Sequence, residues 1–139
     1  MSLVFPDVNV WMALTVIHVH QAVAFDWWQR EPGAIGFCRF TQLGLLRLLT
    51  TSAAMEGKPR SMKQAWSAYD VLAGDERVEF ISEPPAVEKA FRGLSSSAHA
   101  SPKLWADAYL TAFAGEFGAR LVTFDRSLAR RSSNSLLLQ

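Results

Sequence analysis

The chain has 139 residues, of which half are hydrophobic and 19% are charged, and its formal net charge is only +1. This composition is typical of a globular domain with a sizeable core, and it excludes a largely disordered chain. The near-neutral charge gives no global electrostatic signal for nucleic acid, so any such binding depends on a local patch. The single cysteine, Cys38, excludes an intramolecular disulfide and a cysteine-rich zinc site.

Nothing in the sequence predicts secretion or a membrane span. The first residues carry no basic segment followed by a long apolar one, so no signal peptide is expected. No apolar run reaches the roughly 18 residues that a membrane-spanning helix requires. We therefore expect a cytoplasmic protein with no membrane partner, folded as a single domain over residues 1–139.

Short apolar runs alternate with segments of helical periodicity along the chain. Runs rich in branched and aromatic residues predict strands at residues 3–7, 35–40, 78–81, 121–125 and 136–138, the last at a sheet edge. Helical spacing predicts helices at about residues 9–14, 20–30, 41–49, 62–72, 84–91 and 102–117. Strands that alternate with helices predict a three-layer α/β/α domain around a parallel central sheet of four to five strands.

Single residues are expected to set several of these boundaries. Thr41 is predicted to cap the third helix, and Ser101 with Pro102 the helix that carries Asp107. Gly118 is expected at the C′ position that ends this helix. The small and polar residues 51–61 and 95–100 predict loops.

Asp7 and Asp125 each end a predicted buried strand. In open α/β sheets, ligands bind just beyond the carboxyl ends of the strands, so both acids stand where a site is expected. Thr123 lies two residues before Asp125, on the same face of its strand, and is expected to orient a carboxylate or a water. The alternative for each acid is a structural role as the cap of the next helix.

Asp107 lies in a helix whose other residues are nearly all apolar or small, which predicts that this helix is buried. An ionised carboxylate in such a place needs a partner, because its desolvation costs several kcal/mol or more. A divalent cation shared with Asp7 and Asp125 is our first hypothesis. The alternative is a buried ion pair with Lys103 or an arginine.

Other polar residues near these acids are candidates for supporting roles. Asn9 is expected to hold the Asp7 carboxylate or a metal-bound water, or simply to start a helix. Lys103 and Arg126 are predicted to contact RNA phosphates, as part of a basic group that scattered surface charge explains equally well. No G-x-x-x-x-G-K or G-x-S-x-G motif is present, which argues against an NTPase and an α/β-hydrolase. An acid-only site favours metal-assisted hydrolysis with Mg²⁺ or Mn²⁺.

Four segments, in order along the chain, resemble the motifs of one known family. They are residues 7–14 (DVNVWMAL), 41–49 (TQLGLLRLL), 101–110 (SPKLWADAYL) and 121–126 (LVTFDR). Together they resemble the ordered motifs of PIN-domain ribonucleases, and among these the VapC toxins of bacterial VapBC toxin–antitoxin systems. The resemblance covers essentially the whole chain.

This resemblance implies a PIN-like fold and a Mg²⁺- or Mn²⁺-dependent endoribonuclease toxin that cuts structured RNA such as tRNA or rRNA. It also implies a homodimer and a VapB-type antitoxin as a protein partner. The acidic metal-binding and catalytic positions of the family fall on Asp7, Asp107 and Asp125, with Asn9 and Thr123 as supporting polar residues.

The chain departs from the family pattern at one position. A glutamate is usual near the start of the helix after the second strand, whereas this chain has Gln42 there, or Gly44 if the register shifts by two. Glutamine can still bind a metal-coordinated water, but it brings no charge. Gln42 therefore keeps one rival hypothesis open, a catalytically weak or inactive PIN-like module that binds RNA or protein. A second rival is a phosphatase of the haloacid-dehalogenase type, because Asp7-x-Asn9 faintly resembles the D-x-D motif of that family, although Asn9 cannot serve as its second aspartate.

Overall fold

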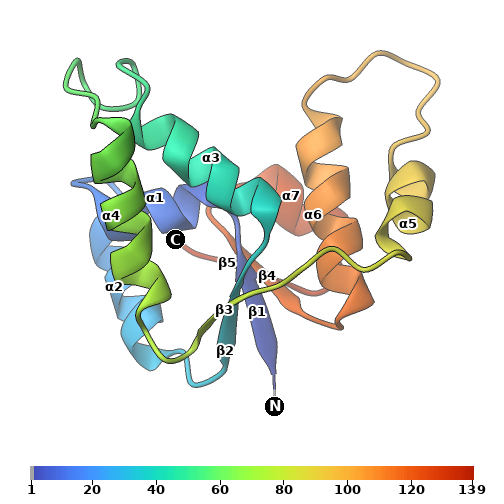
Figure 1. The fold of residues 1–139 in the computed structure, drawn as a ribbon. Helices are drawn as coiled ribbons and strands as arrows, with labels where there is room; N and C mark the ends of the chain where they lie inside the picture. Colours follow the sequence, from blue (N-terminus) through green and yellow to red (C-terminus); the bar gives the residue numbers. More distant parts are fainter. Residues whose placement is uncertain (1) are drawn as a thin grey trace.

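A parallel five-stranded sheet lies at the centre of the structure, with helices on both of its faces (Figure 1). This computed structural model describes residues 2–139. The strands are β1 Leu3–Pro6, β2 Ala34–Phe37, β3 Val78–Phe80, β4 Arg120–Thr123 and β5 Ser135–Leu137, in the order β3-β2-β1-β4-β5. The helices are α1 Val8–Thr15, α2 Gln21–Arg30, α3 Arg39–Leu49, α4 Met62–Ala73, α5 Val87–Leu94, α6 Leu104–Glu116 and α7 Arg126–Arg131.

Each face of the sheet has its own apolar core. Helices α1 to α4 cover one face, where Trp11 is fully buried and stacks on Phe37 with the ring centroids 3.7 Å apart. Helices α5 to α7 cover the other face, where Phe5 meets Phe113 edge to face at 5.0 Å. Neighbouring strand residues point to opposite faces, so the unbroken apolar run of β1 serves both cores. The predicted three-layer architecture is confirmed, with five strands.

The pairing of β1 with β4 determines where the site forms. These strands are parallel neighbours, and Pro6 lies opposite Val122. The backbone N–H of Asp7 then donates to the carbonyl of Val122 at 2.9 Å, which extends the pairing by one residue. Both strands therefore end at the same edge of the sheet, with Asp7 beside Thr123.

The start of α3 differs from the prediction. Strand β2 ends at Phe37 instead of residue 40, and Cys38 is the N-cap of α3. Thr41 is not the cap, because it already lies in the first turn of the helix. Its hydroxyl donates to the Cys38 carbonyl and accepts from the Cys38 backbone N–H, both at 3.1 Å. Thr41 thus supports the cap from inside the helix.

Two further boundaries correct the prediction and one agrees with it. The N-cap of α6 is Lys103, without a side-chain hydrogen bond, and Ser101 contributes only its carbonyl, which accepts from Leu104 N at 2.9 Å. Helix α7 was not predicted as a separate element. Gly118 has a φ of +58° directly after the end of α6, which confirms it as the C′ residue. Within residues 2–139, no helix is both long and apolar enough to cross a bilayer.

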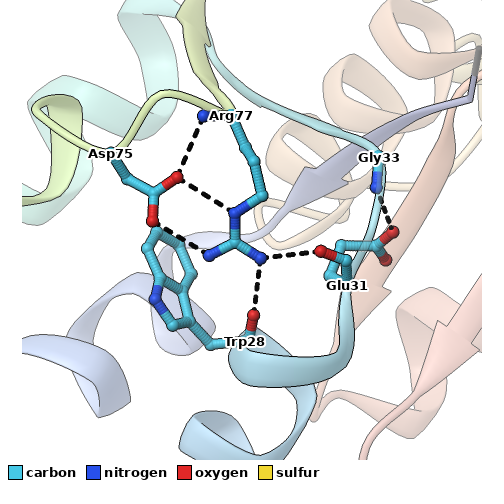
Figure 2. A network of polar contacts seen from close by, with 5 residues as sticks. All are labelled: Trp28, Glu31, Gly33, Asp75 and Arg77. Carbon is cyan, nitrogen blue, oxygen red and sulfur yellow. Dashed lines mark hydrogen bonds and ion pairs between the residues drawn. The ribbon is translucent and has the colours of Figure 1, made fainter.

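Arg77 ties the end of α2 to the start of β3 (Figure 2). Its guanidinium donates to the carbonyls of Trp28 and Glu31, each at 2.7 Å, and so satisfies carbonyls that the helix end leaves unpaired. The same group makes a bidentate pair with Asp75 at 3.0 Å and lies 4.6 Å from the centre of the Trp28 ring. The hydrogen bonds from Arg77 lower the pKa of the Asp75 carboxyl.

We expect Asp75→Asn to lower the free energy of unfolding at pH 7 by about 1 kcal/mol, because the bidentate ion pair is lost while the side-chain oxygen can still accept. The pKa of Asp75 is depressed in the folded state, so its contribution is complete above the unfolded pKa and disappears as the pH falls through the folded one. Urea unfolding at pH 7 and at acidic pH measures this difference, which should vanish at the lower pH.

The matched control is Asp26→Asn, because the Asp26–Arg30 pair has side chains that are 60% and 79% exposed. An exposed ion pair of this kind contributes little to the free energy of unfolding. A loss of stability in Asp26→Asn as large as in Asp75→Asn would contradict the role assigned to Arg77.

Candidate active site

Asp7 is a buried carboxylate at the junction of β1 and α1. It is 6% exposed and caps α1, with Oδ1 accepting from Asn9 N at 2.8 Å. Its Oδ2 accepts a hydrogen bond from the hydroxyl of Thr123. Burial raises the pKa of Asp7 above its ordinary value, the hydrogen bonds oppose this rise, and the charge of Asp125 adds to it.

The Thr123 hydroxyl connects the ends of the two central strands. It is fully buried, donates its proton to Asp7 Oδ2, and accepts from the backbone N–H of Asp125 at 2.9 Å. A hydroxyl has one proton to give and lone pairs to accept with, so both functions of the group are used. The expectation that Thr123 faces a carboxylate is therefore met by its contact with Asp7.

Asp125 lies directly after β4 and caps α7. Its Oδ1 accepts from Ser127 N at 2.8 Å and from Leu128 N at 3.2 Å. For Asp7 and Asp125 alike, the capping role and the position at the carboxyl edge of the sheet coexist. Asp125 is exposed to solvent, and its charge raises the pKa of both Asp7 and Asp107.

Asp107 is half-buried on α6, which packs against α7. Burial raises the pKa of its carboxyl, the charge of Asp125 raises it further, and Arg131 opposes the rise. The expectation that α6 is buried on all sides was wrong, since Trp105 is 58% exposed. Helices α5 and α7 also contact α6, but Asp107 itself is only half-buried, so it is partly hydrated and needs less compensation than a fully buried acid.

The alternative of an ion pair to Lys103 or an arginine is not observed for Asp107. In the part of the chain that the structure describes, the ion pairs are Arg30–Asp26, Arg77–Asp75 and Arg92–Glu88. None of them involves an acid of the candidate site. Asp125 therefore acts electrostatically on both Asp7 and Asp107, and in the described residues none of the three acids is held in an ion pair.

The donor set fits a hard divalent cation in its chemistry, although the side chains do not form a closed cage. Mg²⁺ and Mn²⁺ prefer carboxylate oxygens, and the site supplies Asp7, Asp107 and Asp125. Over residues 2–139, no three His, Cys, Asp or Glu side chains are arranged closely enough to hold a metal as they stand. Asp125 has turned Oδ1 onto α7, and both oxygens of Asp7 already accept hydrogen bonds. The side chains therefore have to move before the three can share an ion.

The remaining candidate residues are placed as follows. Asn9 is exposed, and its backbone rather than its side chain holds Asp7. Gln42 is 5% exposed, and its Oε1 accepts from Arg39 Nη1 at 2.5 Å. Lys103 and Arg126 are exposed at the starts of α6 and α7, on the helices that carry or follow the acids.

Arg131 is the residue whose position the sequence did not reveal. Its positive charge acts on Asp107 and opposes the rise in the pKa of that carboxyl. A prediction of α7 would have supplied the missing signal. Asp125 caps α7, and Arg131 is the last residue of that helix, less than two turns away. Since α7 contacts α6, Arg131 lies on an element beside the one that carries Asp107.

Comparisons with known proteins identify the family of this chain. The family model described as PIN domain matches residues 4–133. Two curated relatives, each called Ribonuclease VapC41, come from Mycobacterium tuberculosis strains CDC 1551 / Oshkosh and ATCC 25618 / H37Rv. Each is 37% identical over 139 residues, with 95% of this chain and 95% of the relative covered.

Solved structures share the fold at much lower identity. VapBC2 from Rickettsia felis, bound to a DNA fragment from its promoter, matches with a TM-score of 0.67 and 14% identity over 99% of both chains. Mycobacterium tuberculosis VapC20, a toxin that cleaves the sarcin-ricin loop, matches with a TM-score of 0.66 and 17% identity over 93% of this chain and 94% of that one. The match to the family over most of the chain and the identity to the curated relatives lead to one conclusion: the protein belongs to the PIN-domain family, and its sequence groups with VapC members of that family.

Proposed function

We propose that this protein is a metal-dependent endoribonuclease, the toxin of a toxin–antitoxin pair, and that it hydrolyses phosphodiester bonds of structured RNA such as tRNA or rRNA. The observation that carries the proposal is that Asp125 acts electrostatically on both Asp7 and Asp107, while none of the three acids has an ion-pair partner among residues 2–139. The name of the curated relatives, Ribonuclease VapC41, supports the reaction class.

Asp7, Asp107 and Asp125 are the residues we propose to hold Mg²⁺ or Mn²⁺. When bound, such an ion supplies an activated water for attack on the phosphodiester and neutralises charge on the leaving oxygen. The chain contributes the positions of the oxygens: α1 and α7 fix the carboxylates they receive as caps, and Thr123 sets the orientation of Asp7. Asp107 comes from a separate helix and completes the set.

Lys103 and Arg126 are the side chains we propose to contact RNA. Each is exposed at the start of a helix that carries or follows one of the acids, where a cation can meet a phosphate without being buried. Asn9 is exposed beside Asp7 and is available to a water or to the substrate. Gln42 is engaged by Arg39, so we assign it a supporting role at the start of α3 and no charge at the metal.

We propose a VapB-type antitoxin as the protein partner and a homodimer as the assembly. The Rickettsia felis structure is of a VapBC complex, which supports the first proposal. The chain also has apolar surface available for protein contacts, since Leu43, Met62 and Trp66 around the groove between α3 and α4 are 58%, 72% and 47% exposed.

We expect Asp7→Asn, Asp107→Asn and Asp125→Asn each to reduce cleavage of total tRNA or rRNA by at least about 100-fold in Mg²⁺ or Mn²⁺. Each change removes one charged oxygen ligand and leaves the volume of the side chain unchanged. Cleavage by the unaltered protein should stop in EDTA and return when the metal is restored, as gel analysis of the RNA ends measures.

Asp26→Asn on the exposed surface of α2 serves as the control for this series and should cleave like the unaltered protein. Equal cleavage in EDTA would contradict the metal-dependent mechanism. Retained RNA binding with no turnover in any divalent metal would instead select the inactive binding module, and turnover of p-nitrophenyl phosphate would select the phosphatase.

We expect Mg²⁺ to raise the melting temperature of the unaltered protein, because binding to the folded state adds about 1.4 kcal/mol at about ten times the Kd. Asp107→Asn should remove most of this gain. In the absence of metal at pH 7, the same variant should be more stable than the parent. The pKa of Asp107 is raised by folding, so its ionised form destabilises the folded state above the unfolded pKa. An unchanged response of Asp107→Asn to Mg²⁺ in calorimetry would contradict its place among the ligands.

We expect Thr123→Val to destabilise the protein by about 1–3 kcal/mol at pH 7, because it leaves Asp7 Oδ2 and Asp125 N without their common partner. The hydrogen bond from Thr123 lowers the pKa of Asp7, so its loss should raise that pKa, and the destabilisation should grow as the pH rises. Urea unfolding across pH and a carbon NMR titration of Asp7 measure both effects. Thr123→Ser retains the hydroxyl and should behave like the parent, and a loss equal to that of Thr123→Val would argue for packing instead.

A further inference from the structure

The connection between α5 and α6 and the first turn of α6 enclose a cavity of about 400 Å³. This lies within the usual range for small-molecule sites. We propose that the cavity is a subsite for one nucleobase of the RNA substrate, with Trp105 as its stacking wall. The proposal deepens the ribonuclease function above and rests on it.

Trp105 has the properties of a stacking surface. Its side chain is 58% exposed, which is unusual for a residue of this size, and it lines the cavity. On α5, Phe91 meets the indole at a centroid distance of 6.1 Å and an angle of 65°, so the ring is supported by a neighbouring side chain. A supported aromatic ring open to solvent is what single-stranded RNA uses to stack an unpaired base.

The polar groups of the cavity suit the edges of a base. The His99 imidazole and the Ser101 hydroxyl line it, and neither makes a hydrogen bond with any other residue in the described range 2–139. The Ser97 hydroxyl accepts from the backbone N–H of His99 at 3.1 Å and keeps its own proton to donate. Donors and acceptors are therefore both available for the hydrogen-bonding edge of a base.

The charge distribution distinguishes a base from an anionic group. Apart from the histidine, the described side chains that line the cavity are uncharged, so the cavity itself offers a phosphate or a carboxylate no arginine or lysine. The nearest basic residue in the sequence is Lys103, which is exposed between two lining residues, Pro102 and Leu104. A cavity without arginine or lysine, next to the exposed Lys103, suits a nucleotide, because the base is uncharged and the phosphate is negatively charged.

The position of Trp105 on α6 relates the subsite to the candidate active site. Trp105 precedes Asp107 by two residues, which is about 3 Å along the helix axis and about 200° around it. The two side chains therefore leave α6 on nearly opposite sides. An RNA strand that crosses the first turn of α6 can place one base against Trp105 and a phosphate farther along the strand toward Asp107. The subsite thus reads a flanking base, and we expect it to influence the choice of cleavage site.

The experiment measures binding of a short fluorescein-labelled oligoribonucleotide of mixed sequence to the full chain in EDTA, by fluorescence anisotropy. Trp105→Ala should weaken binding about five- to a hundredfold, and Trp105→Phe should retain most of the affinity. Phe25→Ala is the matched control, because Phe25 is also an exposed aromatic residue, at 43%, but lies on α2. A melting curve for each variant checks that it is folded.

Abasic substitutions, moved one nucleotide at a time along the oligoribonucleotide, separate stacking from a structural effect. The parent should lose affinity at one position, and Trp105→Ala should be insensitive at that position. Affinity equal to the parent in Trp105→Ala, or no binding by the parent, would overturn the subsite. Weakened capture of an antitoxin with unchanged RNA affinity would also overturn it, in favour of a protein-docking surface. Cleavage of RNA in Mg²⁺ is scored separately, so failure of the subsite does not decide the proposed function.

Discussion

The crowding of like charges at the carboxyl edge of a parallel sheet is the constraint on which the site depends. Strands β1 and β4 are neighbours, so Asp7 and Asp125 leave the sheet at the same edge, and α6 adds Asp107. Repulsion by Asp125 contributes to the raised pKa of both other acids. A fold that keeps such an arrangement stores unfavourable electrostatic energy, which a divalent cation can relieve when it binds.

Secondary structure holds these acids in place. Asp7 and Asp125 are N-caps, so each is anchored by backbone N–H groups of the helix it starts. Thr123 joins the two caps through one hydroxyl, donating to the first and accepting from the backbone of the second. Functional groups on helix and strand ends are positioned more precisely than groups on loops. The capping and site interpretations, which the sequence left as alternatives, therefore describe one arrangement.

Residue positions that follow from the periodicity of apolar side chains and from strand order could be predicted from the sequence. Positions that depend on local backbone geometry could not. Apolar runs that end in an acid identified Asp7 and Asp125, because parallel strands bury both faces and end at one edge. Thr41 was misassigned because Cys38 adopts the extended conformation of a cap three residues earlier. The exposure of Trp105 and the place of Arg131 depend on which side of α6 the sheet covers and on a short α7. Apolar composition alone does not report either.

The most direct test of the account is a carbon NMR titration of the Asp7 and Asp107 carboxyl groups, with and without saturating Mg²⁺. Without metal, both pKa values should lie above the ordinary value for aspartate, since burial and Asp125 act on each. Mg²⁺ should lower both pKa values together, because a shared cation favours the charged form of every ligand. Two pKa values that ignore Mg²⁺, or a pKa of Asp107 already depressed by Arg131 in its absence, would contradict the shared-cation site.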